Sequence, residues 1–297
     1  MVEYIKSPLN YIGGKHKLLK EILPYFKNSI DKFVDLFAGG FNVGINIDAE
    51  IIICNDLNKF VIDMFRYFQV TAITEILAII NDRINKFELS DTNAIGYLKL
   101  REKYNALKEP IDLFLLTCYS FNHQIRFNSK HEFNNPFGRH RSSFNNSIEK
   151  NLINFCKALK NKNIVFNSDD FMKIDYSILS SSDLVYCDPP YLISTGSYND
   201  GSRGFKDWSQ KEELQLLGLL DALNNAGVNF ALSNVFYHKG LSNDALIDWS
   251  QQYNVYYLDK GYSNCNYQFK SKDLKTVEVL VTNFSKEESK CRQMELF

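Results

Sequence analysis

The stretch Leu184-Val185-Tyr186-Cys187-Asp188-Pro189-Pro190-Tyr191 decides the fold of this chain. Its first four residues are apolar and rich in β-formers, and the two prolines end the run, which is typical of a buried strand. Asp188 would then stand at the carboxyl end of that strand, where open α/β sheets bind their ligands. The prolines remove two N–H donors and restrict the backbone. This corner therefore predicts a binding site made of a carboxylate, rigid carbonyl groups and an aromatic ring.

Such a corner can hold a planar base that carries an exocyclic amino group. The Asp188 carboxylate and the Pro189 carbonyl are acceptors for the amino hydrogens, and the Tyr191 ring offers a stacking face. The motif resembles that of the amino-methyltransferases, whose common form is Asn, Asp or Ser followed by Pro-Pro and then Tyr or Phe. A strand that ends at prolines and packs a tyrosine would look the same, so the motif needs support from the rest of the chain.

The composition is that of an ordinary soluble globular protein, with 45% hydrophobic and 23% charged residues. The 297 residues suffice for one large α/β domain, alone or with an insertion. We expect a cytoplasmic protein that does not enter a membrane, because no apolar run reaches the ~18 residues of a span and the N-terminus lacks a signal-peptide core. The six cysteines are scattered without a C-x-x-C pair, so we expect free thiols and no metal site.

The strand-like runs alternate with helical patterns. One such helix, at residues 212–223, has a capping-box signature in Ser209 and Glu212. This alternation predicts an α/β fold with a doubly wound, mostly parallel sheet of seven strands. Because the polar segment 259–274 holds no crossover helix, the last two strands should be antiparallel. The predicted strands are residues 32–37, 51–54, 163–166, 184–187, 229–232, 255–258 and 276–282.

The interval between the second and third strands breaks this rhythm. It is ~80 residues long, far longer than a normal crossover connection. Helical patterns occupy residues 73–84, 94–107 and 112–119, and a segment rich in Asn, Phe and basic residues follows. We therefore expect one domain from residues 1–69 and 151–297, and an inserted, mainly helical domain from residues 70–150.

A second candidate site follows the first strand. The turn Asp35-Leu36-Phe37-Ala38-Gly39-Gly40 lets the backbone approach a ligand closely. Asp56 ends the second strand about twenty residues later and could accept both hydroxyls of a ribose. A plain tight turn would look alike, and the spacing also fits a nicotinamide cofactor. The segment Tyr11-Ile12-Gly13-Gly14-Lys15 favours a methyltransferase, which could use Lys15 for the methionine carboxylate and Tyr11 at the sulfonium, although a surface turn with a solvated lysine remains open.

Together these motifs resemble one family. The Tyr-Ile-Gly-Gly-Lys segment, the glycine turn, Asn55-Asp56, Asp169-Asp170-Phe171 and Asp-Pro-Pro-Tyr occur in the order of the Dam-type DNA adenine methyltransferases, the α-group. Inside the insertion, residues 122–128 (NHQIRFN) and 132–138 (EFNNPFG) resemble that family's target-recognition signature. The resemblance extends over residues 7–284. It implies a methyltransferase sheet, an inserted DNA-recognition domain, and methyl transfer from S-adenosylmethionine to the amino group of a flipped-out adenine in double-stranded DNA.

Carried over position by position, the resemblance implies two sets of residues. The catalytic residues are Asp188, Pro189, Pro190 and Tyr191. Asp170 would bind the amino group of the cofactor's adenine, with Phe171 against its ring. Phe41-Asn42 and Gln124 depart from the family pattern, at the glycine turn and in the recognition segment. The cofactor-binding residues are Tyr11, Lys15, Asp35, Phe37, Gly39, Asp56, Asp170, Phe171 and Asp188.

The recognition segment is locally basic although the whole chain has a net charge of −1. Arg126 suits bidentate reading of guanine, and Gln124 or Asn122 could pair with adenine in the major groove. Arg139, Arg141 and Lys130 are better suited to phosphate contacts, which position DNA without reading it. A solvated surface run, with Arg126 packed beneath aromatic rings, is the structural alternative. The predicted DNA-binding residues are Phe121, Asn122, Gln124, Arg126, Asn128, Lys130, Pro136, Arg139 and Arg141.

Other functions share parts of this pattern. An RNA or protein methyltransferase could have the same catalytic core, but it does not need a DNA-recognition insertion. An NAD-dependent oxidoreductase leaves the Asp-Pro-Pro-Tyr corner and Lys15 unexplained, and a non-catalytic DNA-binding module would be expected to lose that corner. We therefore predict a sequence-specific adenine DNA methyltransferase, monomeric or weakly dimeric, either with a separately acting restriction endonuclease or as an orphan or phage enzyme.

Overall fold

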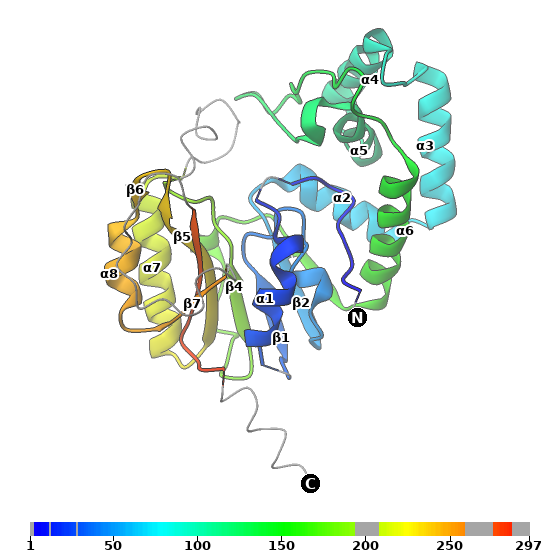
Figure 1. The fold of residues 1–297 in the computed structure, drawn as a ribbon. Helices are drawn as coiled ribbons and strands as arrows, with labels where there is room; N and C mark the ends of the chain where they lie inside the picture. Colours follow the sequence, from blue (N-terminus) through cyan, green and yellow to red (C-terminus); the bar gives the residue numbers. More distant parts are fainter. Residues whose placement is uncertain (1–2, 12, 28, 194–207, 259–275, 287–297) are drawn as a thin grey trace.

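The computed structural model describes residues 3–11, 13–27, 29–193, 208–258 and 276–286 (Figure 1). The predicted polar segment 259–274, and Cys265 and Cys291, lie outside these residues. A central sheet stands between helices, and a helical region lies to one side of it. The strands are β1 (Lys32–Asp35), β2 (Ile51–Asn55), β3 (Ile164–Asn167), β4 (Leu184–Cys187), β5 (Asn229–His238), β6 (Leu241–Ser242), β7 (Asn254–Tyr257) and β8 (Val277–Thr282).

The strand order of the sheet is β3-β2-β1-β4-β5-β8-β7. The neighbours from β3 to β5 are parallel, whereas β8 is antiparallel to both β5 and β7. The antiparallel final pair is thus confirmed. The sheet also contains an eighth strand, since β6 pairs with the end of β5 through a turn at Lys239-Gly240. The sequence predicted seven strands, and a two-residue strand carries too short a pattern to be seen there.

The described residues contain eight α-helices. The helix predicted at 94–107 has these bounds, and the one predicted at 112–119 begins two residues earlier because Pro110 is suited to the first helical turn. The predicted capping box is present, with Ser209 and Glu212 each bonding to the other's backbone. The helices are α1 (Leu19–Ile22), α2 (Lys59–Val70), α3 (Ile73–Phe87), α4 (Ala94–Leu107), α5 (Pro110–Tyr119), α6 (Asn146–Asn161), α7 (Gln210–Asn225) and α8 (Asp244–Ser250).

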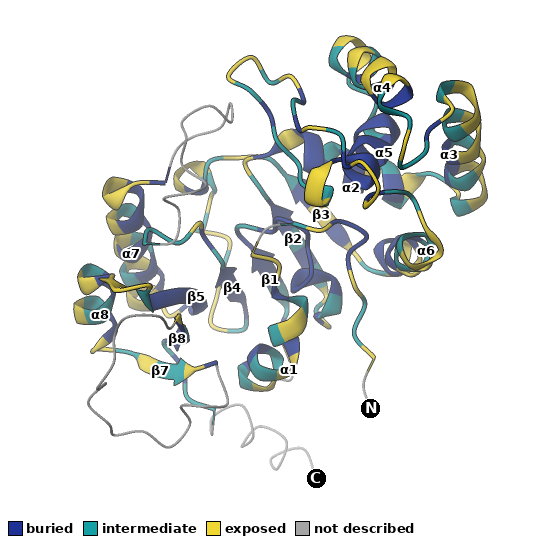
Figure 2. Cartoon of the chain, turned by 45° about the horizontal axis from the view of Figure 1, so that its top comes forward, coloured by how far each residue is buried: buried dark blue, intermediate teal, exposed yellow. Residues whose placement is uncertain are grey.

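Helices cover both faces of the sheet. Strand β4 shows this most clearly, because Leu184 and Tyr186 belong to one hydrophobic cluster and Val185 and Cys187 to another. The first cluster includes residues of α1, α2 and α6, and the second includes residues of α7 and α8. The central strands, such as β4, are therefore buried between two layers and are dark blue in Figure 2, whereas the edge strand β7 is partly exposed.

The region of α3, α4 and α5 packs against α2 and lies beside α6 (Figure 1). Its core is continuous with the sheet's first cluster, which includes Phe68 of α2 and Phe114 of α5. The fully buried Asp112 pairs with Arg83 and Lys103, and this cluster joins the three helices. Helix α6 then runs from this region back to the sheet.

Two further observations concern the described residues. Cys54, Cys118, Cys156 and Cys187 are free and buried, as expected from their scattered positions. Among these residues we found no helix with the length and apolar character needed to cross a membrane.

Candidate active site

The loops that follow β1, β2, β3 and β4 converge on one cavity of about 630 Å³. The strand order reverses between β1 and β4, and ligands of open α/β sheets bind outside the carboxyl ends of strands at such a switch point. All the residues predicted to be catalytic or to bind the cofactor line this cavity. Residues from distant parts of the sequence are therefore brought to one place.

Asp188 lies at the centre of the predicted catalytic corner. Its Oδ1 is 2.8 Å from Lys15 Nζ and accepts a hydrogen bond of 3.1 Å from the Tyr191 hydroxyl. Lys15 Nζ also donates to the Gly13 carbonyl and lies 4.8 Å from the centre of the Tyr191 ring. Burial raises the pKa of Asp188, and the Lys15 and Tyr191 contacts act in the opposite direction. The sequence predicted Lys15 for the cofactor but did not predict its ion pair with Asp188.

Asp35, the first residue of the glycine turn, has a buried side chain. Its Oδ2 accepts a hydrogen bond of 3.0 Å from the Gly44 N–H, and only 2% of the residue is exposed. The pKa of Asp35 is raised to about 8, mainly by burial and in part by the nearby carboxylates of Asp188 and Asp56, while the hydrogen bond from the Gly44 N–H acts in the opposite direction. The side chain of Asp35 therefore binds the backbone of the segment that follows the glycine turn.

Phe41, which departs from the family pattern, has its side chain in the core. It has a φ of 57° and is fully buried, with its ring 6.0 Å from that of Phe65. Asn42 lines the cavity, and its Oδ1 accepts a hydrogen bond from Ser7 N–H. Because the Phe41 side chain lies in the core, it does not occupy the cavity.

The glycine turn is joined to Tyr11 and Asp56. Gly39 has a φ of +50°, and a Cβ atom there would lie 2.9 Å from Tyr11 Cδ1. Only glycine suits both this backbone conformation and this close approach. The two oxygens of Asp56 accept hydrogen bonds of 2.8 Å from the N–H groups of Gly39 and Asn58. Burial raises the pKa of Asp56, and these two N–H groups act against that rise.

Asn55 holds two of the loops together, a role that the sequence did not reveal. Its Nδ2 donates to the carbonyls of Leu36 and Asp169, and its Oδ1 accepts from Asp169 N–H. The neighbouring Asp170 caps the short helix after β3 by accepting from Met172 N–H at 3.1 Å. The sequence singled out Asn55 only as part of a motif, because a buried amide has no distinguishing pattern of its own.

Three aromatic rings form one wall of the cavity. Phe37 and Phe171, both predicted for the cofactor, have ring centres 5.4 Å apart. Trp208 completes the group at 5.4 Å from Phe37 and 5.8 Å from Phe171. Sequence reasoning missed Trp208, since it lies outside every motif, just before α7.

The recognition segment reaches the same cavity. Ile125, Arg126 and Phe127 line it, so Arg126 is the predicted DNA-binding residue found in the lining. The Asn122 carbonyl accepts a hydrogen bond of 3.0 Å from Asn10, which connects the segment to the region before Lys15. The buried Asn135, which the sequence did not single out, donates to the carbonyls of Phe121 and Gln124.

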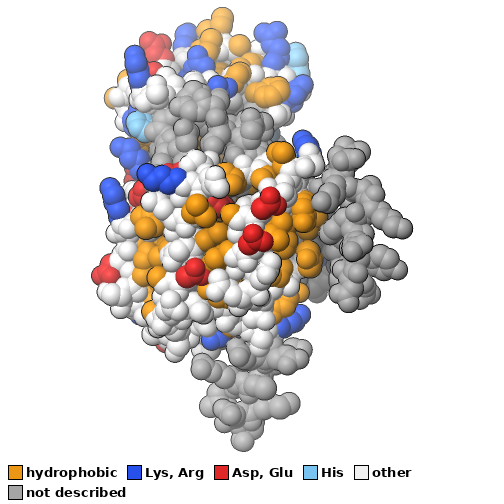
Figure 3. Space-filling view, turned by 90° about the vertical axis from the view of Figure 1, so that its left-hand side faces the viewer, with side chains coloured by type: hydrophobic (Ala, Val, Ile, Leu, Met, Phe, Trp, Pro, Cys, Tyr) orange, Lys and Arg blue, Asp and Glu red, His pale blue; other side chains and the backbone are white. Residues whose placement is uncertain are grey.

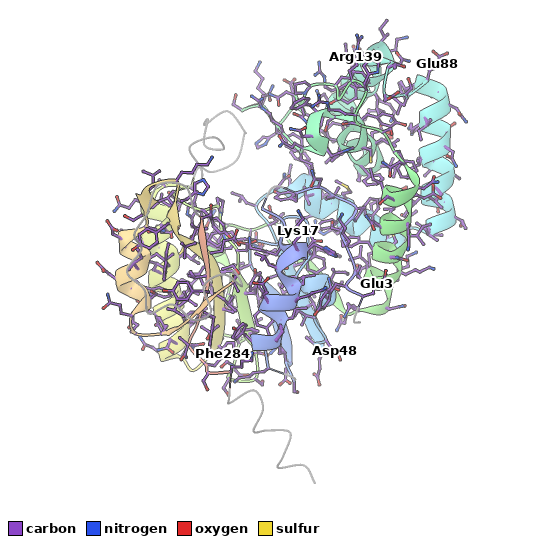
Figure 4. All side chains as sticks on the ribbon, in the orientation of Figure 1. Glu3, Lys17, Asp48, Glu88, Arg139 and Phe284 are labelled. Carbon is purple, nitrogen blue, oxygen red and sulfur yellow. The ribbon has the colours of Figure 1, made fainter. Side chains whose placement is uncertain are left out.

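The other predicted DNA-binding residues lie away from the cavity lining. The Asn128 side chain organises a turn by accepting from the N–H groups of Lys130 and Glu132. Arg141 lies 5.1 Å from the Phe121 ring, and the Pro136 carbonyl accepts from Phe121 N–H. Arg139 is exposed at the outer end of the helical region (Figure 4). On the face in Figure 3, Lys and Arg side chains gather on the upper part, which carries this region.

Among the described residues, no three or more His, Cys, Asp or Glu side chains come together in a cluster that could hold a metal ion. The cavity instead offers carboxylates, backbone N–H groups, one buried ammonium group and flat rings. Such a set can bind a polar molecule with an aromatic base and can accept hydrogen bonds from an amino group.

Comparison with known proteins identifies the family. Residues 11–264 match the D12 class N6 adenine-specific DNA methyltransferases. The chain belongs to this family. It is 51% identical over 282 residues to the Type II methyltransferase M.FokI of Planomicrobium okeanokoites, and 49% identical over 284 residues to the modification methylase StsI of Streptococcus sanguinis. Each match covers 95% of this chain but 43% of the relative, so this D12 chain spans less than half the length of either.

A more distant relative has a length closer to that of the chain. The DNA adenine methylase of Haemophilus influenzae is 32% identical over 188 residues, which are 62% of this chain and 63% of the relative. The resemblance to Dam-type enzymes is thus confirmed at the level of the family.

Proposed function

We propose that this D12 chain is a site-specific adenine DNA methyltransferase. It transfers a methyl group from S-adenosylmethionine to the exocyclic amino group of an adenine flipped out of double-stranded DNA. The observation that carries the proposal is the shared cavity, because the Asp188–Tyr191 corner, the Asp35–Gly40 turn with Asp56, and Arg126 all line it. A base and a nucleoside cofactor could therefore meet at Asp188.

The residues present fit S-adenosylmethionine, the methyl donor of this chemistry. Asp56 is fixed by two backbone N–H groups, and its oxygens retain lone pairs that can accept from ribose hydroxyls. Phe37 and Phe171 offer rings for the adenine of the cofactor, and Tyr11 lies against Gly39. Lys15 suits the methionine carboxylate, because its ammonium group has three N–H donors and its contacts with Asp188 and the Gly13 carbonyl use only two of them. When bound, S-adenosylmethionine supplies an electrophilic methyl group on its sulfonium.

Asp188 and Pro189 would activate the target. The amino nitrogen of adenine is a poor nucleophile because its lone pair is delocalised into the ring. Hydrogen bonds from its two hydrogens to the Asp188 carboxylate and the Pro189 carbonyl favour a more tetrahedral nitrogen, with the lone pair free to attack. Positive charge develops on the nitrogen during attack, so both interactions strengthen in the transition state.

Lys15 and Tyr191 would prepare Asp188 for this task. The ammonium group 2.8 Å away favours the ionised carboxylate, which is the better acceptor. The Tyr191 hydroxyl fixes the same oxygen, Oδ1, and its ring can stack on the flipped base. Stacking of this kind is worth ~1–3 kcal/mol and offsets part of the cost of taking the base out of the duplex.

The helical region would hold the DNA. We assign residues 70–150 as the target-recognition domain, and residues 1–69 and 151–297 as the catalytic domain. Arg126 at the cavity would read a base, whereas the exposed Lys130, Arg139 and Arg141 would contact phosphates. The enzyme would act either beside a separately acting restriction endonuclease or as an orphan or phage methylase, and the relative StsI is named a modification methylase.

Parallel methylation assays test this function. The protein is incubated with methyl-labelled S-adenosylmethionine and either double-stranded DNA, RNA or a protein mixture. We expect label in double-stranded DNA alone, in an amount that saturates when each recognition site is filled. Label in RNA or protein, with none in DNA, would contradict the proposal and favour another substrate of the same core.

A further inference from the structure

A buried carboxylate lies behind the aromatic wall of the cavity. Glu213 of α7 is only 1% exposed. Its Oε2 accepts a hydrogen bond of 2.7 Å from Trp208 Nε1. Its Oε1 accepts from the side-chain amides of Asn234 at 3.0 Å and Asn243 at 2.8 Å. Residues of three separate segments thus converge on one carboxylate.

This arrangement is costly for a residue that only fills the core. Burying a carboxylate costs free energy unless hydrogen bonds compensate it, and apolar side chains would pack there at lower cost. Burial raises the pKa of Glu213, and the bonds from Trp208, Asn243 and Asn234 oppose that rise. Three neutral donor groups therefore bond to this one carboxylate. One consequence is that the bond from the Trp208 N–H fixes the orientation of the indole ring.

Trp208 is placed where its orientation matters. Its ring meets Phe37 edge-on, at 87° between the planes, and is tilted by 44° from Phe171. All three residues line the cavity, and Trp208 is 6% exposed. Because its N–H group is held by Glu213, the indole cannot turn without breaking that bond. Glu213 therefore determines the shape of the aromatic wall without lining the cavity itself.

We propose that Trp208 is the third ring of the aromatic wall that packs against the cofactor's purine, and that Glu213 is a positioning residue that holds it there. This inference rests on the proposed use of S-adenosylmethionine. It adds a binding residue and a positioning residue outside the motifs that define the site. Preorganised side chains of this kind increase affinity because less freedom is lost on binding.

Tryptophan fluorescence offers a direct test, since the chain has only two tryptophans. The second, Trp249, donates to Asp221 Oδ1 at 2.7 Å and lies outside the cavity lining. In the W249F variant the emission comes from Trp208 alone. We expect S-adenosylhomocysteine, an unreactive product, to change this emission saturably, with a midpoint equal to the Kd from calorimetry. The W208F variant, which reports Trp249, should bind ligand with little change in emission.

The outcomes separate this inference from the proposed function. Binding detected by calorimetry while Trp208 emission stays constant would overturn the role of Trp208 and leave the proposed cofactor intact. No heat and no change in emission would overturn both.

The role of Glu213 is tested with a matched pair of variants on α7. In E213Q, the amide nitrogen of the glutamine replaces one carboxylate oxygen and cannot accept a hydrogen bond. At least one of the three bonds from Trp208, Asn234 and Asn243 is therefore lost. We expect the Kd for S-adenosylhomocysteine to rise roughly ten-fold, and Trp208 emission in W249F/E213Q to shift to longer wavelength. D221N is the control, because Asp221 likewise accepts from a tryptophan, Trp249. It should leave the Kd unchanged.

Two results would refute the role of Glu213. One is an unchanged Kd together with unchanged Trp208 emission in E213Q. The other is an equal loss of affinity in E213Q and D221N, which would mean that any weakening of α7 has this effect. If E213Q does not fold, the titration of W249F still decides whether Trp208 meets the ligand.

Discussion

At the scale of single residues, the candidate site depends on how Asp188 is held. Lys15 Nζ and the Tyr191 hydroxyl both contact its Oδ1, so the carboxylate has one orientation. The sequence predicted Asp188, Tyr191 and Lys15 individually from motifs. It could not predict that Lys15 reaches Asp188, because the two lie 173 positions apart (188 − 15) and only the fold brings them together.

The first prediction concerns Asp188 itself. D188A removes the charged acceptor and should lower the rate of methyl transfer by about 10²–10³-fold or more, the effect of losing one preorganised group in a transition state. DNA affinity should largely survive, because contacts to phosphates supply most of it. Single-turnover rates and a DNA titration measure the two effects separately. Near-normal turnover in a folded variant would remove Asp188 from the proposed mechanism.

The second prediction separates the ring of Tyr191 from its hydroxyl. Y191F keeps the stacking face but loses the hydrogen bond to Asp188, while the Lys15 ion pair remains. We expect Y191F to keep activity within about ten-fold of wild type, since one hydrogen bond is worth roughly 1 kcal/mol. Y191A should be much slower. If the two variants lose activity equally, the hydroxyl and not the ring is the essential part.

The third prediction uses the raised pKa of Asp35, which is about 8 against an ordinary value of 3.8. Between these values the folded protein keeps a proton that the unfolded chain releases. The contribution of Asp35 to stability is therefore complete below pH 3.8 and is lost as the pH rises towards 8. The free energy of unfolding should therefore fall with a slope of at most about 1.4 kcal/mol per pH unit in this range.

D35N should remove this slope, because the amide does not titrate and its oxygen can still accept from Gly44. Urea unfolding at several pH values between 5 and about 8 measures it. D35N should gain stability relative to wild type as the pH rises. Parallel curves for the two proteins would show that Asp35 is ionised in the folded state.

At the scale of elements, regular structure was predicted well and irregular structure was not. The runs of β-formers located β1 to β5, β7 and β8 to within a few residues, except that β5 extends six residues further. Helices α2 and α6 were not predicted as separate elements.

The irregular recognition segment could not be predicted from local preferences. Asn122 and His123 have φ values of 55° and 54°, and hydrogen bonds from the Asn135 side chain to the carbonyls of Phe121 and Gln124 hold the segment on either side of them. Local sequence preferences carry no signal for such bonds.

The fourth prediction compares two arginines of this region. Arg126 lines the cavity, whereas Arg139 is exposed at the outer end of the helices (Figure 4). R126A should relax discrimination at one base pair by about 1–3 kcal/mol. R139A should weaken binding to all sequences alike and reduce the salt slope by about one unit. Binding competitions with single-base variants of the mapped site decide this, and equal losses on every variant would show that Arg126 is not a reader.

At the scale of the whole molecule, the fold explains why scattered motifs act together. The order of strands places the ends of β1 and β4 side by side at the switch point, with those of β2 and β3 next to them. The helical region shares a core with the sheet and brings residues 125–127 to the same cavity. The sequence predicted this site through the order of its motifs and their resemblance to a family. The supporting roles of Asn55, Trp208 and Glu213 could not be predicted, because they depend on tertiary hydrogen bonds and ring contacts that leave no local pattern in the sequence.

The central claim is that the cavity transfers a methyl group to the amino nitrogen of adenine in DNA. Its most direct test is nucleoside analysis by mass spectrometry of DNA treated with the protein and S-adenosylmethionine, with D188A treated in parallel. We predict N6-methyladenine as the new nucleoside with the wild-type protein, and a yield about 10²-fold less or lower with D188A after the same short reaction time. A methylated cytosine in place of N6-methyladenine, or the same yield of N6-methyladenine from D188A, would contradict the account.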